Sequence, residues 1–255
     1  MQGLDNRTVL VTGGALRIGR AIVDALVSAG AGVVVHAHAS QAAADTLVAG
    51  IRGRGGRAWR VGGALETPEG AAGVFRDALA EAGRIDGLVN NAAVFARQSL
   101  AASDAAAFET CWRVNALAPM LLTWLLAGHV AAVHTCATAP VAGVVNLLDQ
   151  RIARPCAGCL PYLVSKQALA AFTTSAAMEL APRITVNAVA PGAALAPVAA
   201  RESAGAVPLG RRCTPEQIAN AVAYLLSNPA ITGQILYVDG GQHLGDGVSS
   251  LNPAS

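Results

Sequence analysis

The chain contains 255 residues with a net charge of +2, and 53% of its residues are hydrophobic whereas 13% are charged. This composition excludes a disordered chain, and the length suffices for one α/β domain with a substantial core. The small net charge and the scattered arginines exclude a nucleic-acid footprint, so we expect a small-molecule partner and no nucleic acid.

Apolar stretches of strand and helix character alternate along the chain. Predicted strands cover residues 8–11, 33–37, 58–61, 85–89, 144–148, 185–190 and 235–238. Predicted helices cover residues 19–29, 41–52, 68–82, a segment from about 104, 116–126, 162–180 and 215–226. Strands that are apolar throughout and alternate with helices indicate a parallel sheet covered on both faces. The sequence therefore predicts a Rossmann-like, doubly wound α/β fold in a single domain over residues 1–255.

Two segments do not follow this alternation. Residues 193–210 are rich in Ala, Pro and Gly with little periodicity, which indicates a flap over a substrate site. Residues 245–255 are predicted to form a frayed tail.

An uncharged stretch raises the question of a membrane span. Residues 116–148 contain no Asp, Glu, Lys or Arg. Prolines, histidines and an asparagine interrupt the stretch, whereas a span requires about 20 continuous apolar residues. We therefore expect no membrane span, and the lack of a signal-like start favours a cytoplasmic location.

A glycine-rich turn joins the first predicted strand to the first predicted helix. It reads Thr12-Gly13-Gly14-Ala15-Leu16-Arg17-Ile18-Gly19. Glycines at such a turn let the backbone approach a pyrophosphate, which then lies at the positive end of the helix. The strand-turn-helix context favours a dinucleotide site over a simple tight connection.

The end of the second predicted strand carries no acid. An NAD enzyme would place Asp or Glu there, about 20 residues past the glycines, to bind the ribose 2′-hydroxyl. This chain has His36, His38 and Ser40 instead, with Arg17 and Arg20 nearby in sequence to attract a 2′-phosphate. The pattern favours NADPH; the alternative is a merely polar strand end, because a neutral His contributes little charge.

Tyr162 and Lys166 stand four residues apart in a predicted helix and therefore share one helical face. A free Tyr, with a pKa of about 10, is a poor acid or base at neutral pH, and a nearby cation lowers that pKa by favouring phenolate. The pair is therefore a candidate proton-transfer device, although Tyr and Lys also meet at this spacing by chance.

Cys156 and Cys159 form a CxxC motif. A structural zinc site needs a second pair, and a thioredoxin-like site needs its motif at a helix start after a strand. The odd count of five cysteines does not indicate a disulfide framework. We expect a loop near Tyr162 and no metal site.

Further short motifs follow in order, namely Asn90-Asn91-Ala92, Asn115 and Pro191-Gly192. Together with the glycine-rich turn and the Tyr-Lys pair, this order resembles the short-chain dehydrogenase/reductase family over residues from about 8 to 244. The resemblance implies that Tyr162 is the general acid or base, and that Lys166 tunes it and binds the nicotinamide ribose. Asn115 would support a proton relay. The implied cofactor-binding residues are Gly13, Arg17, Ile18, Gly19, His38, Ser40, Leu65, Asn91, Ala92, Lys166, Pro191 and Gly192. The family also implies a homotetramer, in which a partner subunit covers the apolar helix at Ala116.

Two departures from the usual family pattern resemble the pteridine reductase branch. Arg17 replaces the middle glycine of the turn, and Asp149 stands thirteen residues before Tyr162, where the family usually has a catalytic Ser. In that branch the Asp works with the Tyr in proton delivery and the Arg reaches cofactor phosphate and pterin. An aromatic after the Asn-Asn motif stacks on the pterin, and Phe95 has that position here. The implied substrate-binding residues are Arg17, Phe95, Asp149 and Tyr162, and the implied catalytic residues are Asp149, Tyr162, Lys166 and Asn115.

Two other positions differ from the expected cofactor contacts. Ala39 stands where the branch commonly has a basic residue, and Ala64 stands where the family has an Asp that holds the adenine. Both changes are expected to lower the affinity for NADPH.

The leading hypothesis is an NADPH-dependent oxidoreductase that transfers hydride to a pterin or related C=N heterocycle, with Tyr162 and Asp149 supplying the proton. One alternative is a carbonyl reductase or alcohol dehydrogenase of the same family. The other is a cofactor-binding protein without turnover, against which the intact Asn115, Tyr162 and Lys166 argue.

Overall fold

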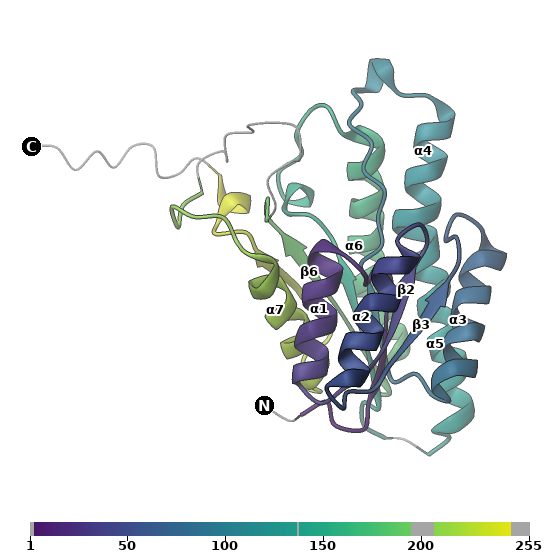
Figure 1. Ribbon diagram of the computed structural model, residues 1–255. Coiled ribbons are helices and arrows are strands. Elements are labelled where there is room, and N and C mark those ends of the chain that lie inside the picture. The colour runs from purple at the N-terminus through teal and green to yellow at the C-terminus, as the bar shows by residue number, and fades with distance from the viewer. Residues whose placement is uncertain (1–2, 137, 195–206, 246–255) are drawn as a thin grey trace, which may run out of the picture.

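The computed structural model describes residues 3–136, 138–194 and 207–245, and this part of the chain forms one seven-stranded sheet with the order β3-β2-β1-β4-β5-β6-β7 (Figure 1). The strands are β1 Thr8–Val11, β2 Gly32–Ala37, β3 Ala58–Gly62, β4 Gly87–Asn90, β5 Ala142–Leu147, β6 Ile184–Pro191 and β7 Ile235–Val238. All neighbouring strands are parallel. Every residue of β1, β2, β4, β5 and β6 is buried, which explains why these strands read as apolar throughout.

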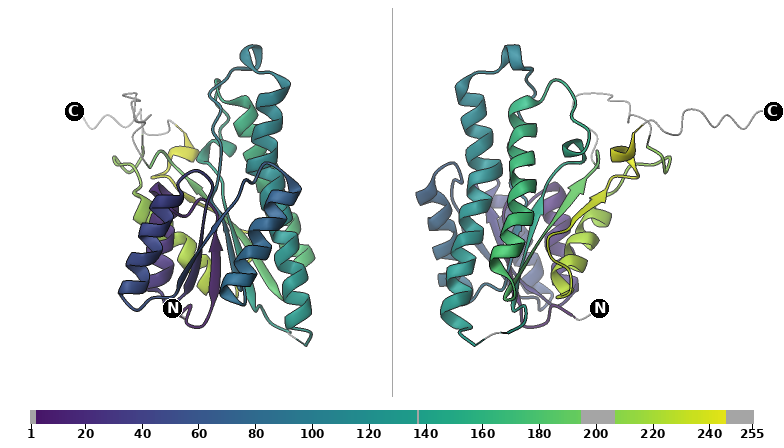
Figure 2. Two further views of the ribbon diagram at one scale, coloured as in Figure 1. Left: turned by 45° about the vertical axis from the view of Figure 1, so that its right-hand side comes forward. Right: turned by 180° about the vertical axis from the view of Figure 1, so that it is seen from behind.

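Helices cover both faces of the sheet (Figure 2). They are α1 Arg17–Ser28, α2 Gln41–Gly53, α3 Pro68–Ala82, α4 Ala105–Trp112, α5 Ala118–Val133, α6 Leu160–Leu180 and α7 Pro215–Ser227. Helices α1, α2 and α7 pack into one hydrophobic cluster on one face, whereas α3, α5 and α6 pack into a second cluster on the other. The predicted Rossmann-like, doubly wound fold is therefore confirmed.

Side-chain caps fix where several helices begin. Thr67 accepts a hydrogen bond from the backbone N–H of Gly70 at the start of α3, and Asp104 accepts one from Ala107 at the start of α4. Thr214 and Gln217 form a reciprocal capping box at α7. Such caps satisfy N–H groups that have no partner within the helix, so these starts follow from the local sequence.

The winding of the sheet reverses at β1, which pairs with β2 on one side and β4 on the other. In open α/β sheets, ligands bind beyond the carboxyl ends of the strands at such a switch point. The glycine-rich turn follows β1 and the Asn90-Asn91-Ala92 motif follows β4, so the fold brings these two motifs together.

Some element boundaries differ from the prediction. Helix α1 begins at Arg17, two residues early, and β4 begins at Gly87, two residues late. The two helices predicted from about 104 and over 116–126 form one continuous stretch, Ala105–Val133, joined by a π-helical turn at Arg113–Leu117. Residues 195–206 of the predicted flap and 246–255 of the predicted tail lie outside the described residues.

The stretch Ala105–Val133 has the length and hydropathy of a membrane span: an 18-residue window within it has a mean hydropathy of 1.8, and 39% of this window is buried. Core helices of soluble proteins pass the same test, so this is weak evidence for a membrane. The inner face of α5 packs Leu122 and Leu126 into the protein core, whereas Trp124 points outward and is 69% exposed.

Candidate active site

The glycine-rich turn is tied to the end of β4 by hydrogen bonds. The hydroxyl oxygen of Thr12 accepts from the backbone N–H groups of Asn91 and Ala92, both at 3.0 Å. The Asn91 amide donates to the backbone oxygens of Thr12 and Gly13 at 2.9 and 3.0 Å. A Cβ on Gly19 would clash with the Gly13 carbonyl oxygen, so only glycine permits this close turn.

The first turn of α1 fits an anionic ligand. Gly13 has φ +60°, and Arg17 has φ +52°, a left-handed conformation that is uncommon for a residue with a Cβ. Leu16 makes no side-chain cap, and no acidic residue lies in the first turn. The first turn of this helix thus carries no carboxylate of its own that would compete for its N–H groups, and the turn can hold the pyrophosphate of a dinucleotide.

His36 has a structural role that sequence reasoning missed. The backbone N–H of Gly13 donates to Nδ1 at 3.2 Å, so Nε2 carries the proton and donates to the Gly63 oxygen at 3.0 Å. Burial lowers the pKa of His36, which keeps the ring neutral. His36 thus ties the turn to the ends of β2 and β3 and offers no charge to a phosphate.

The other predicted cofactor residues lie in different environments. His38 is exposed just beyond β2, and Ser40 directly precedes α2. Ile18 packs, partly buried, against the core cluster under α1, whereas Leu65 is buried in the opposite cluster. His38 and Ser40 are accessible to a ligand, while Leu65 is chiefly a core residue.

Asp149 and Tyr162 meet at the carboxyl end of β5. The Tyr162 hydroxyl, in the first turn of α6, donates to Oδ2 of Asp149 at 3.1 Å. The Arg151 backbone N–H donates to Oδ1 at 2.8 Å, and its guanidinium lies 3.4 Å from Oδ2. Asp149 is therefore held from two sides, and its partner Arg151 was not predicted from the sequence.

The pKa of Tyr162 shifts in the direction opposite to the prediction. Burial raises it well above the ordinary value, and the charge and hydrogen bond of Asp149 raise it further. The Lys166 ammonium lies 5.9 Å from the centre of the Tyr162 ring and does not offset these effects. The predicted net lowering of the Tyr162 pKa beside Lys166 is therefore wrong for this structure, and Tyr162 is a protonated donor at neutral pH.

Lys166 is fully buried beneath Tyr162. Its ammonium donates to the backbone oxygen of Leu147 at 2.6 Å. Burial lowers the pKa of Lys166 to about 8, and the nearby Asp149 charge opposes this shift. The lysine is thus poised to lose its proton close to physiological pH.

Asn115 lies on the π-helical turn between α4 and α5. Its side-chain oxygen accepts from the Val94 N–H at 2.8 Å, and its amide nitrogen donates to the Val94 oxygen at 2.9 Å. The same nitrogen donates to the Ser165 hydroxyl at 3.1 Å. Asn115 therefore fixes the segment that carries Phe95, and π-helical turns often occur at functional sites.

Phe95 covers the Asp149–Tyr162 pair on the solvent side. Its ring centre lies 4.8 Å from that of Tyr162 at an angle of 75°, and the Arg151 guanidinium lies 5.8 Å above the Phe95 ring. Phe95 is 50% exposed. A cavity of about 230 Å³ next to Phe95 and Arg151 can admit part of a flat ring.

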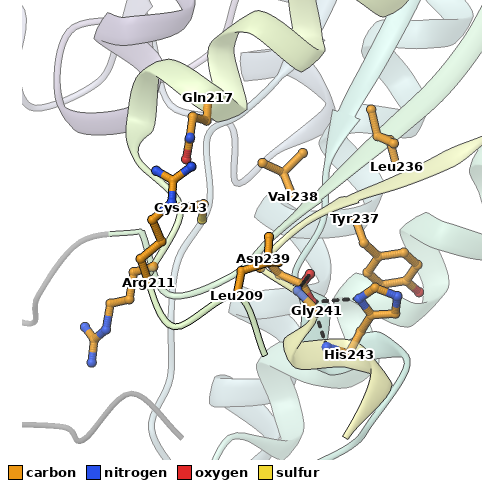
Figure 3. A pocket seen from close by; sticks show the side chains of 12 residues that line it. Leu209, Arg211, Cys213, Gln217, Leu236, Tyr237, Val238, Asp239, Gly241 and His243 are labelled. Carbon is orange, nitrogen blue, oxygen red and sulfur yellow. Dashed lines mark hydrogen bonds and ion pairs between the residues drawn. The ribbon is translucent and has the colours of Figure 1, made fainter. Parts of the chain in front are cut away.

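A second cavity, of about 410 Å³, lies beside the carboxyl end of β7 (Figure 3). Buried Asp239 accepts hydrogen bonds from the backbone N–H of Gly241 and His243 and from the His243 ring, at 2.7 to 2.8 Å. Figure 3 shows the two contacts with His243 as dashed lines. A Cβ on Gly192 would meet Asp239 and Gln242 at less than 3 Å, so the backbone of the Pro191-Gly192 motif packs directly against this cluster.

Comparison with known proteins agrees with this architecture. A family model described as enoyl-(acyl carrier protein) reductase matches residues 14–243. Pteridine reductase 1 of Leishmania tarentolae is 33% identical and aligns with 92% of this chain and 96% of its own. A 3-oxoacyl-[acyl-carrier-protein] reductase of Synechocystis is 30% identical over 94% of this chain and 98% of its own. The crystal structure of FolM alternative dihydrofolate reductase 1 from Brucella suis in complex with NADP is 35% identical, with a TM-score of 0.85, and covers 94% of this chain and 96% of that one. The chain therefore belongs to the short-chain dehydrogenase/reductase family of oxidoreductases, and within it is similar to the pteridine reductases.

Proposed function

We propose that this protein uses NADPH to reduce a C=N bond of a pterin or related heterocycle. The observation that carries the proposal is the Tyr162 hydroxyl donating to Asp149, with Phe95 packed edge-on to the tyrosine. This arrangement joins a proton donor, a carboxylate and an aromatic face at one end of the sheet.

The glycine-rich turn and the end of β4 would hold the cofactor. Gly13, Gly19 and Asn91 shape the backbone for a pyrophosphate, while Arg17, His38 and Ser40 would meet a 2′-phosphate. Ala92, Pro191 and Gly192 would lie near the nicotinamide end of the cofactor, and Lys166 would hold the nicotinamide ribose. NADPH, when bound, supplies the hydride. The NADP complex of the Brucella relative supports this choice of cofactor.

Tyr162 and Asp149 would deliver the proton. Tyr162 is protonated at neutral pH because burial and Asp149 raise its pKa, so its hydroxyl can donate. Asp149 accepts a hydrogen bond from the Tyr162 hydroxyl. It can receive a proton from solvent for the next catalytic cycle. Lys166 would replace a proton lost from Tyr162, and Asn115 positions the segment that carries Phe95.

The carboxylate favours a ring nitrogen over a ketone as the proton acceptor. An ionised carboxylate only accepts hydrogen bonds, and it would repel the negative charge that develops on a ketone oxygen during reduction. A pterin ring nitrogen instead requires a proton, and Phe95 offers an aromatic face for the flat ring. A carbonyl reductase is the second candidate, supported by the similarity to a 3-oxoacyl-[acyl-carrier-protein] reductase.

A substrate panel tests the proposal. NADPH oxidation is measured with pterins, dihydrofolate, imines and ketones, and we expect turnover with the pterin group. Asp149→Ser should lose most pterin reduction and gain weak ketone reduction. Asp149→Asn should lose pterin reduction and gain no ketone reduction. Tyr162→Phe should lower turnover by roughly 10² or more while NADPH still binds.

Several results would contradict this function. Pterin reduction by Asp149→Ser at the parent rate across pH 5 to 8 would show that the carboxylate has no role in proton transfer. A response to ketones alone would favour the carbonyl reductase. Tight NADPH binding without any turnover would indicate a non-catalytic cofactor-binding protein.

We also propose that the protein acts in the cytoplasm as a homotetramer. Exposed apolar side chains on α4, α5 and α6 include Trp112, Trp124, Val164 and Met178. A second copy of the chain would cover these side chains.

A further inference from the structure

The CxxC motif forms a close thiol pair. The Sγ atoms of Cys156 and Cys159 are 3.7 Å apart. Cys156 is exposed to solvent, whereas Cys159 is 3% exposed and directly precedes the first residue of α6. The two sulfurs need to approach only to about 2.05 Å to form a disulfide bond.

The pair forms one wall of the cavity that adjoins the candidate active site. Cys156, Gly158 and Cys159 line this cavity opposite Phe95 and Arg151. Cys159 lies three residues before Tyr162 on the same chain segment. The proton-transfer chemistry proposed above uses neither thiol, so the pair needs a separate explanation.

We propose that Cys156 and Cys159 form a modification site for low-molecular-weight disulfides, which convert the pair to an intramolecular disulfide and reshape the substrate cavity. The oxidant class is a symmetric disulfide RSSR, for which oxidised glutathione is the probe.

The reaction balances in two exchange steps. The Cys156 thiolate attacks one sulfur of RSSR, which forms a Cys156–S–SR bond and releases RS⁻. The Cys159 thiolate then attacks Sγ of Cys156 and releases the second RS⁻. Two protein thiols are oxidised, RSSR is reduced to two RSH after protonation, and the protein loses two hydrogen atoms.

Exposure and acidity fix the order of these steps. Cys156 faces solvent and can reach RSSR, whereas Cys159 is shielded. Burial, together with the hydrogen bond to the adjacent Cys156, raises the pKa of Cys159 to about 11. The second step therefore limits ring closure at neutral pH, and closure accelerates as the pH rises toward 11.

The loop between the cysteines can adjust to the bond. Gly158 has φ +87°, and no heavy atom outside its own neighbours lies within 4 Å of a Cβ placed there. Ring closure draws residues 156–158 toward the start of α6, which moves the wall that faces Phe95. The effect on substrate rests on the proposed function, and the turn that would hold NADPH lies at the end of a different strand. We therefore expect the oxidised form to raise the substrate KM by roughly three- to tenfold with little change in the NADPH Kd.

Peptide mapping tests disulfide formation without any assay of function. The purified protein is incubated with oxidised glutathione, its free thiols are alkylated, and trypsin is added. Both cysteines fall in the peptide 152–166, because the Arg154–Pro155 bond resists trypsin. We expect this peptide to be unalkylated and lighter by two hydrogens, and to regain two alkyl groups after reduction. Two alkyl groups on it after oxidant treatment would overturn the proposal.

Matched variants separate this pair from the other cysteines. Cys136→Ser removes a different exposed cysteine, in the loop that precedes β5 at the opposite edge of the sheet, and should respond to oxidised glutathione as the parent does. Cys159→Ser should stop at the mixed disulfide of Cys156, and Cys156→Ser should show no mass change in this peptide. An equal rise in KM on oxidation of Cys156→Ser would refute a role for the pair. Disulfide formation in a protein that reduces no pterin would refute the proposed function alone.

Discussion

At the scale of single residues, Lys166 shows a conflict between stability and function. It is the sole lysine in a chain with 18 lysine and arginine residues, and it is fully buried with no carboxylate among the described residues in hydrogen-bonding contact. Lowering its pKa from 10.5 to about 8 corresponds to roughly 3 kcal/mol against the charged form. The folded protein retains a charge here that its core disfavours.

Lys166→Met should therefore stabilise the protein while removing turnover. Methionine has a similar length and needs no solvation, so we expect a gain of about 1 to 3 kcal/mol in the free energy of unfolding at pH 7. Because the folded-state pKa is below the unfolded one, the gain is complete below pH 8 and shrinks between pH 8 and 10.5. Urea unfolding at both ends of this range measures it.

Isotope labelling provides an independent check on the cause. Labelled lysine gives a single side-chain resonance in this protein, which should titrate near pH 8. A resonance that titrates at the ordinary lysine value, together with an Lys166→Met variant no more stable than the parent, would show that the ammonium is well solvated.

At the scale of elements, backbone strain occurs at the start of α1, where we propose that the cofactor binds. Arg17 is exposed and adopts φ +52° at a position suited to glycine. A left-handed conformation costs a residue with a Cβ roughly 1 to 2 kcal/mol. The exposed Arg17 guanidinium contributes little packing to offset this cost, which is consistent with the proposed contact to a 2′-phosphate.

Arg17→Gly should relieve the strain and weaken the preference for NADPH. Glycine adopts this φ freely, so we expect unchanged or slightly increased stability. The ratio of the NADH and NADPH dissociation constants should fall toward one, whereas Arg17→Lys should keep most of it. Arg20→Ala is the comparison variant: Arg20 was also predicted near the 2′-phosphate, but it lies 3.7 Å from Asp24, so we expect its removal to change the ratio less. If the ratio of the NADH and NADPH dissociation constants is unchanged in Arg17→Gly, residues other than Arg17 bind the 2′-phosphate.

The sequence predicts the helices and strands of this protein better than the side-chain contacts between them. The strands were predictable because both faces of the sheet are covered, and the motifs were predictable because their order is distinctive. The π-helical turn at Asn115 was not, because one extra residue in a helix leaves no mark on an apolar pattern. His36 and Arg151 act through partners distant in sequence or through local geometry, so neither residue type nor spacing revealed them.

At the scale of the whole molecule, the long helical stretch Ala105–Val133 presents apolar side chains to its surroundings. Trp124 is 69% exposed on α5, and Met178 is 81% exposed on α6. Large exposed apolar side chains on adjoining helices often mark a contact with another protein or a membrane. Trp124 lies between Leu122 and Leu126, which face the core, so its outward direction follows from helix geometry.

Trp124→Glu should therefore break the assembly without unfolding the subunit. A buried charge at a subunit interface is strongly unfavourable, whereas the same charge on a free surface is well solvated. Light scattering after size-exclusion chromatography should show a tetramer for the parent and a smaller species for Trp124→Glu, with unchanged circular dichroism. Leu100→Glu, at a position 67% exposed in the turn before α4, should leave the tetramer intact. A monomeric parent that sediments with lipid vesicles, and a Trp124→Glu variant that does not, would instead assign this face to a membrane surface.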